Sequence, residues 1–301
     1  MHLRPRDILI FEAIQRHGPL PSHYLYEFTK DAAHDRIGFR KRLTALRRTG
    51  LLDCPEQLNN PLIKTDFKVY ILTKKSEEIL RDAGKLNHFA SPVSGGYQHM
   101  FMAACITANI EIEAMKAGFR YIAQEEILAK QTCPDETRAA MKPLALASSI
   151  AWEFSRADGK KYAHKSARST EPDQLFGIDY GNGVRFFALE ADRGTEPLTR
   201  PNLSENSILR KVLSYKDILI RGEFKKRYGI PNLYPLFVTT AEDRVDNMLA
   251  LTRSIYPNGS NFLLFKAIGG FQFYFRTPPL LPELFTAPYK RVGDMFAINN
   301  G

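Results

Sequence analysis

The segment PDQLFGIDYGNGVRFFALEAD, residues 172–192, decides the fold of the second half of this chain. Two alternating apolar runs, 175–180 and 184–189, flank Asn182-Gly183. An Asn-Gly pair between two strand-like runs is the strongest short-range signal for a β-hairpin with a two-residue type I′ turn. The segment therefore predicts two antiparallel strands that reverse at Asn182-Gly183.

The strand pairing that follows from this turn brings three carboxylates together at the open end of the predicted hairpin. It places Asp173 opposite Asp192, and the alternation of side chains puts Glu190 on the same face. Each acid of the second strand then lies within roughly 7 Å of Asp173. Like charges so close destabilise a sheet unless a cation offsets them. Mg²⁺, or Mn²⁺ in its place, is the cation that such oxygen ligands favour.

A solvated strand end is the alternative interpretation of the same residues. Carboxylates are common at strand ends, and a loop of three residues would reverse the parity and scatter the three acids. The pattern therefore leaves two readings open: a divalent-metal site for phosphodiester chemistry, or three exposed acids without a shared role.

The composition is that of a globular protein that meets a polyanion. With 301 residues, the chain can hold two domains, each with its own core. Hydrophobic residues at 44% and charged residues at 25% argue against extensive disorder. Lys and Arg number 42 against 33 Asp and Glu, a net charge of +9. This excess, which is clustered, indicates a polyanion as the partner, and double-stranded DNA is the polyanion we expect.

The cysteines and the apolar runs indicate the cellular compartment of the protein. Cys54, Cys105 and Cys133 are far apart and form no CxxC pair, which predicts reduced, mostly buried thiols rather than zinc ligands or disulfides. The N-terminus has no signal-peptide core, and no run of eighteen apolar residues occurs. A cytoplasmic protein that does not enter a membrane is expected.

Residues 5–83 predict a small DNA-binding module of three short helices followed by two strands. The third helix, from about Asp35, buries Ile37, Leu43 and Leu46 and is the most basic stretch of the chain. The run KVYILTKK at 68–75 contains Tyr-x-Leu-Thr-x-Lys and resembles the second wing strand of the winged-helix family. The resemblance implies that the third helix enters the major groove. The candidate DNA contacts on it are Arg36, Arg40, Lys41 and Arg47.

The rest of the chain predicts a mixed α/β domain. A linker at 87–96 leads to a long helix, and the order helix, hairpin, helix, strand, helix, strand follows. A basic run, 160–168, reads as a loop that could hold a DNA backbone. A later helix has an apolar stripe formed by Ile208, Val212, Tyr215 and Leu219. Lys211 lies within the arc of that stripe. A lysine there either extends to solvent or serves a buried anion.

The pattern Pro172-Asp173, hairpin, Glu190-x-Asp192 resembles the PD-(D/E)XK nuclease superfamily, whose fold is a mixed sheet flanked by helices. The longer stretch PDQLF to FFALEADRGTE, ending at Glu196, resembles the replication-relaxation family of plasmid and mobile-element proteins, related to MobC-type relaxases. That resemblance implies a winged-helix domain at 1–86 and a nuclease-like domain at 97–301. It also implies that Asp173 and Glu190 are metal ligands.

One departure from the superfamily pattern matters. The lysine expected two residues after the second acid is Asp192 in this chain, and Lys211 is the residue that could replace it. The resemblance thus implies a metal-dependent DNA endonuclease or nickase with Asp173, Glu190, Asp192 and Lys211 in its site. The alternative is a catalytically inactive DNA-binding regulator or replication accessory protein. The sequence leaves open whether two copies associate as a homodimer.

Overall fold

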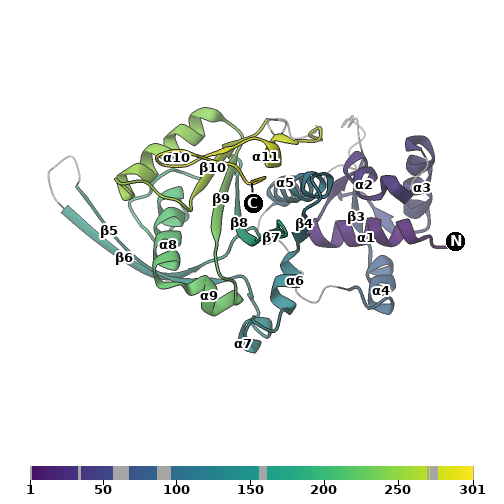
Figure 1. Ribbon diagram of the computed structural model, residues 1–301, viewed down its shortest axis with the longest axis horizontal. Coiled ribbons are helices and arrows are strands. Elements are labelled where there is room, and N and C mark those ends of the chain that lie inside the picture. Colours follow the sequence, from purple (N-terminus) through teal and green to yellow (C-terminus); the bar gives the residue numbers. More distant parts are fainter. Residues whose placement is uncertain are drawn as a thin grey trace. The chain divides into compact units, whose positions relative to one another are not determined.

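Contacts between residues divide the chain into two units (Figure 1). The first is Met1–Tyr121 with Gly269–Ala287, and the second is Ile122–Ile268 with Pro288–Gly301. This computed structural model describes residues 2–32, 35–56, 68–86, 96–155, 161–269, 271 and 277–300. Both units combine helices with β-sheet, so the predicted mixed α/β class is confirmed.

The first unit surrounds a small antiparallel sheet with helices. Its helical elements are α1 (Pro5–His17), α2 (Ser22–Thr29), the 3₁₀ turn η1 (Lys30–Ala32), α3 (Arg36–Arg48), α4 (Lys74–Asp82), α5 (Tyr97–Lys116) and α11 (Glu283–Thr286). Its strands are β1 (Leu20–Pro21), β2 (Leu52–Asp53) and β3 (Val69–Leu72), in the order β1-β3-β2. The predicted run of three helices before two strands is present, and residues 57–67, where the wing between those strands would form, lie outside the described residues.

Helix α5 is part of the core of the first unit. Its apolar side chains join the cluster built on α1, α2 and α3. A buried polar contact also ties α1 to α5: Nδ1 of His17 lies 2.9 Å from Oγ1 of Thr107, and Nε2 lies 2.5 Å from Oε2 of Glu111. The division therefore differs from the predicted domain start at residue 97. The predicted linker, 87–96, lies outside the described residues except for Gly96.

The second unit is built on a mixed sheet in the order β12-β11-β10-β9-β8-β7-β4. β8 pairs with β7 antiparallel and with β9 parallel, and β9 pairs with β10 parallel. The central strands are buried on both faces, as their nearly continuous apolar runs require. The strands are β4 (Arg120–Ile122), along which the chain passes from the first unit to the second, β7 (Gln174–Asp179), β8 (Val184–Asp192), β9 (Tyr234–Thr239), β10 (Leu264–Ala267), β11 (Tyr289–Lys290) and β12 (Met295–Phe296).

Helices and a separate two-stranded ribbon complete the second unit. The helices are α6 (Gln124–Ala129), α7 (Asp135–Arg138), α8 (Ile208–Arg221), α9 (Glu223–Tyr228) and α10 (Glu242–Ile255). Helix α10 packs on β9, β10 and α8, while α8 also packs on the ribbon. The ribbon joins β5 (Leu146–Ser155) to β6 (Lys161–Thr170) and extends away from β8 and β9 (Figure 1).

The predicted loop at 160–168 is wrong for residues 161–168, because these residues form a strand. Ten residue pairs join β6 to β5. Ile150 pairs with Ser166 and both are buried, as is the pair Leu146 and Thr170. The polar residues of the run therefore did not mark a loop, since one side of a two-stranded ribbon can remain in water.

The hairpin forms, but its turn lies one residue earlier than predicted. The N–H of Tyr180 donates to the carbonyl of Gly183 at 2.9 Å, so Gly181 and Asn182 are the central residues. Gly181 has φ +84°, the positive value that the first central position of a type II′ turn requires. Ile178 consequently pairs with Arg185 instead of Phe187. The register moves by two residues, and every side chain keeps its predicted face.

The cysteines are as predicted: Cys54, Cys105 and Cys133 are free thiols and all three are buried. Burial raises the pKa of each thiol. Within the described ranges, no helix has both the length and the apolar character that a membrane crossing needs.

Candidate active site

The open end of the β7–β8 hairpin carries the first two acids of the site. Asp173 precedes β7 and continues its ladder, because its N–H donates to the carbonyl of Leu189 at 2.9 Å. Continuing the observed register places Asp173 opposite Glu190, not opposite Asp192 as predicted. Oδ2 of Asp173 accepts a hydrogen bond from the N–H of Ala191 at 2.7 Å. This contact fixes the carboxylate beside the second strand.

Glu190 is buried, with 1% of its surface exposed, and both of its carboxylate oxygens have partners from α8. The hydroxyl of Tyr215 donates to Oε1 at 2.6 Å, and Nζ of Lys211 lies 2.9 Å from Oε2. Burial raises the pKa of Glu190, the charge of Asp173 acts in the same direction, and Lys211 opposes both. One helix therefore supplies both groups that hold this acid in place.

Lys211 bridges two acids. Its Nζ lies 2.9 Å from Oε2 of Glu190 and 2.9 Å from Oε2 of Glu196, and 19% of its side chain is exposed. Burial disfavours the charge, but attraction to Glu190, Asp173 and Glu196 outweighs burial and raises the pKa of Lys211. The ammonium is thus charged at neutral pH. Of the two predicted positions for this lysine, the structure shows contact with a buried acid rather than extension into water.

Asp192 is paired with groups other than Lys211 and Tyr215. Oδ2 of Asp192 lies 2.9 Å from Nε of Arg244 and accepts a hydrogen bond from Oγ1 of Thr239 at 2.8 Å. Only 3% of Asp192 is exposed. By alternation, Asp192 shares a face with Glu190, as predicted. Its carboxylate, however, is neutralised by a guanidinium from α10.

The oxygen ligands suit a divalent cation that takes part of its coordination shell from a substrate. Among the described residues, no group of three or more His, Cys, Asp or Glu is arranged to hold a metal on its own. Asp173 and Glu190 nevertheless supply hard oxygen donors, and Oε1 of Glu196 is buried without a hydrogen-bond partner. Mg²⁺ commonly binds through one or two carboxylates together with water and phosphate. These residues therefore fit a Mg²⁺ ion whose coordination shell is shared between protein and phosphate oxygens.

The sequence did not indicate Tyr215 or Glu196 as members of the site. Tyr215 was assigned to the apolar stripe of its helix, although it lies four residues after Lys211, the spacing that puts two side chains on one helix face. That spacing is the signal that could have found it. Glu196 ends the stretch that resembles the replication-relaxation family, but its spacing from the other acids gave it no role in the predicted site.

A second candidate surface is the exposed side of α3. The buried side is made by Phe39, Leu43 and Leu46. Ile37 is 70% exposed, so its predicted place in the core is wrong. At 3.6 residues per turn, the side opposite the core carries Ile37, Lys41, Thr44 and Arg48, all exposed.

The four predicted DNA contacts are all exposed, but they occupy different positions on α3. Lys41 lies on its outward side, whereas Arg36, Arg40 and Arg47 lie on one flank. The guanidinium of Arg36 lies 5.3 Å from the centre of the Tyr26 ring, and Nε of Arg47 lies 3.6 Å from Oδ1 of Asp53.

Comparison with known proteins identifies the family to which this chain belongs. The profile of the replication-relaxation family matches residues 11–233, and the chain belongs to that family. The membership points to a function connected with replication or mobile elements. No curated protein matches the chain, and no solved structure does.

Proposed function

We propose that this protein is a cytoplasmic, metal-dependent DNA nicking enzyme or endonuclease of a plasmid or mobile element. In this proposal residues 1–86 are a winged-helix domain that binds double-stranded DNA. The second unit is a PD-(D/E)XK-like nuclease domain whose site contains Asp173, Glu190 and Lys211. Asp173 and Glu190 are the proposed Mg²⁺ or Mn²⁺ ligands. Asp192 has a structural role instead of the catalytic one expected from the sequence, because Arg244 neutralises it.

One observation carries the proposal: the largely buried Lys211 contacts the buried Glu190, and Asp173 lies opposite Glu190 across the antiparallel strand pair. Burying Glu190 and Lys211 costs several kcal/mol per ion before their attraction is counted. Apolar residues of similar size would often give equal or greater stability. Charged groups retained in such a place, with shifted pKa values, mark a candidate functional site.

The proposed chemistry assigns a role to each residue. Bound Mg²⁺ would polarise a phosphoryl oxygen and make a bound water more acidic. Asp173 and Glu190 orient that ion, and Tyr215 fixes the rotamer of Glu190 through its hydroxyl. Lys211 donates to a developing negative charge on phosphate, and Glu196 holds the ammonium in position. Lys211 thereby takes the place of the lysine that position 192 lacks.

A plasmid-nicking assay tests the proposal. Supercoiled DNA is incubated with Mg²⁺ or Mn²⁺ and with wild type, Asp173→Ala or Glu190→Gln. Loss of either carboxylate should lower the nicking rate at least about 100-fold, the scale on which an electrostatic group contributes to catalysis. The affinity for DNA should change less than about twofold. Glu205→Gln, which removes a surface carboxylate paired with Arg200, is the matched control and should nick normally.

The alternative function is a catalytically inactive DNA-binding regulator or replication accessory protein. The neutralisation of Asp192 by Arg244 favours it, because the cluster then keeps two acids from the predicted set of three. Nicking by neither the wild type nor the variants, on several DNA substrates, would support this alternative. Equal nicking by wild type and by both carboxylate variants would reject the proposed site.

A further inference from the structure

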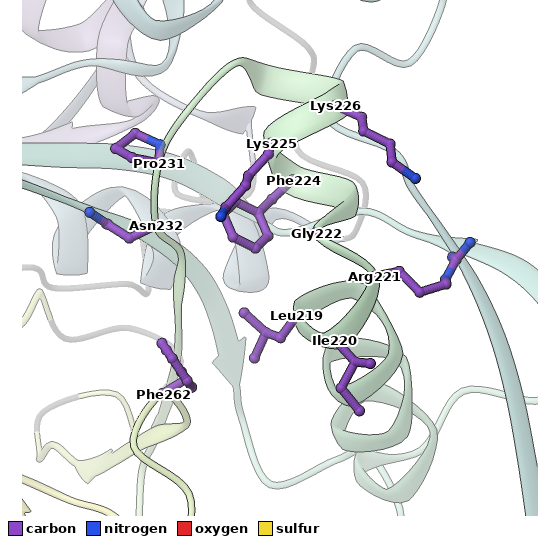
Figure 2. A pocket seen from close by; sticks show the side chains of 10 residues that line it. All are labelled: Leu219, Ile220, Arg221, Gly222, Phe224, Lys225, Lys226, Pro231, Asn232 and Phe262. Atoms are coloured by element: carbon purple, nitrogen blue, oxygen red, sulfur yellow. The ribbon is translucent and has the colours of Figure 1, made fainter.

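An open pocket lies where α8 meets α9 (Figure 2). Its volume is about 570 Å³. One wall is the last turn of α8 with α9, and the other contains Pro231, Asn232 and Phe262. The ten lining residues are Leu219, Ile220, Arg221, Gly222, Phe224, Lys225, Lys226, Pro231, Asn232 and Phe262.

The lining combines water-exposed apolar side chains with positively charged ones. Ile220 is 75% exposed and Phe262 is 42% exposed, two of the few large apolar side chains so exposed in the described part of the chain. Three of the ten lining residues are cationic and none of them is acidic. The apolar surface suits a flat ring, and the cations suit an anion.

Lys225 is the cation placed to serve a ligand in the pocket. Figure 2 shows it extending from α9 toward the wall of Asn232, whereas Arg221 and Lys226 extend the other way. Those two are also paired: Arg221 lies 2.9 Å from Oδ2 of Asp217, and Lys226 lies 3.8 Å from Oε2 of Glu223.

The contacts of Lys225 leave its charge uncompensated. Nζ lies 5.9 Å from the centre of the Phe224 ring, and no acid of the described residues pairs with it. The aromatic ring does not neutralise the ammonium.

We infer that this pocket binds single-stranded DNA, with a base against Phe262 and Ile220 and a phosphate on Lys225. Proteins that hold single strands combine a positively charged path with aromatic side chains on which bases stack. A peptide ligand would find apolar contact here, but the lining cations favour an anionic chain. Phe262 is kept in place for stacking by Tyr234, whose ring centre lies 5.8 Å away.

The position of the pocket on α8 relates it to the candidate active site. Lys211 is near the start of α8 and Ile220 near its end, nine residues later. At 1.5 Å per residue this is about 14 Å along the helix. A few nucleotides of single strand cover that length. The inference deepens the proposed nicking function, because it names a path for an unpaired strand. Only this link between the pocket and the candidate active site rests on the proposed function.

Binding of a fluorescein-labelled oligothymidylate, measured by anisotropy in EDTA, tests the inference. Phe262→Ala should weaken binding about fivefold or more, because stacking contributes roughly 1–3 kcal/mol per base. Lys225→Gln should lower the salt slope by about 0.7. Met295→Ala and Arg253→Gln are the matched controls, since both side chains are exposed and neither lines the pocket. Neither control should change the affinity or the slope.

Two further arms decide what occupies the pocket. Inorganic polyphosphate, which has no bases, should bind equally to Phe262→Ala and wild type, while Phe262→Leu should bind oligothymidylate with intermediate affinity. Unchanged oligothymidylate binding by the Phe262→Ala/Lys225→Gln double variant, with an unaltered melting temperature, would overturn the inference. So would a change in oligomeric state caused by Ile220→Glu without any loss of DNA binding. The anisotropy measurement uses no metal, so its result stands even if the protein is inactive in the nicking assay.

Discussion

Nζ of Lys211 lies 2.9 Å from Oε2 of Glu190, and this contact joins the first turn of α8 to the end of β8. Glu190 is buried and Lys211 is largely so, and Lys211 is the cation that compensates the charge of Glu190. In the proposed function, Lys211 also takes the place of the lysine that the PD-(D/E)XK pattern expects at position 192. Its energetic and chemical consequences can be separated by experiment.

Lys211→Met should abolish nicking and destabilise the fold. It leaves Glu190 buried beside Asp173 without a cation, and breaking a buried ion pair costs about 3 to 5 kcal/mol. Urea unfolding measures this loss. The double variant Glu190→Gln/Lys211→Met removes both charges and should recover at least half of it while remaining inactive. A double variant as unstable as Lys211→Met would show that the methionine itself disturbs the packing.

Arg244→Met should destabilise the protein by about 3 kcal/mol, because it leaves the carboxylate of Asp192 buried without its guanidinium. Asp192→Asn/Arg244→Met should lose less than half as much. Arg253→Met removes an exposed arginine from the same helix and should stay within about 0.5 kcal/mol of wild type. Equal effects of Arg244→Met and Arg253→Met in urea unfolding would refute a structural role for the Asp192–Arg244 pair.

Arg40→Ala/Lys41→Ala should lower the salt slope of double-stranded DNA binding by about 1.8, since each lost phosphate contact contributes ~0.9. Arg48→Ala should lower it by a further ~0.9, because Arg48 lies on the outward side of α3 with Lys41. A titration of affinity against salt concentration measures the slope. Arg81→Ala, which removes an exposed arginine of α4 outside the wing motif, is the control and should leave the slope unchanged.

His23 should make the protein less stable in acid. Burial lowers the pKa of His23 to about 4, with Arg36 and Arg40 contributing and Glu27 opposing. In the unfolded chain the imidazole titrates near its usual 6.5, so between these values the unfolded state binds more protons. Acidification from pH 7 to pH 4 therefore favours unfolding. After a discount for partial exposure, the contribution is about 1 to 2 kcal/mol.

The measurement for His23 is the free energy of unfolding at several pH values. In His23→Gln, stability should fall less than in wild type across this window. Parallel pH profiles for the two proteins would show that His23 does not titrate as described.

Much of the second unit could be predicted from local patterns, and the failures have physical causes. Alternation in 172–192 was enough to place Asp173 and Glu190 on one face. The turn was misplaced because the Asn-Gly signal requires a positive φ at Asn, whereas a preceding glycine, Gly181, adopts the positive φ instead. The pairing of Asp192 with Arg244, 52 residues away, left no local signal.

The first unit shows a different limit of sequence patterns. The periodicity of α5 predicts a helix, but the helix is buried on most of its sides and its neighbours cannot be inferred from its own residues. The predicted domain boundary just before α5 rested on the Pro, Gly and Ser residues of 87–96 and not on the contacts of the helix. On α3, the basic residues were recognisable, but their division between the outward side and the flank depends on which residues are buried.

The position of the turn at Gly181-Asn182 limits which insertions and deletions this hairpin tolerates. Adding or removing two residues at its tip would leave Asp173 and Glu190 facing each other on the same side. A change of one residue would turn Asp173 to the opposite side of the sheet from Lys211 unless a bulge absorbed it. Length variation at this tip among related chains should therefore occur in even steps wherever the acid and the lysine are both retained.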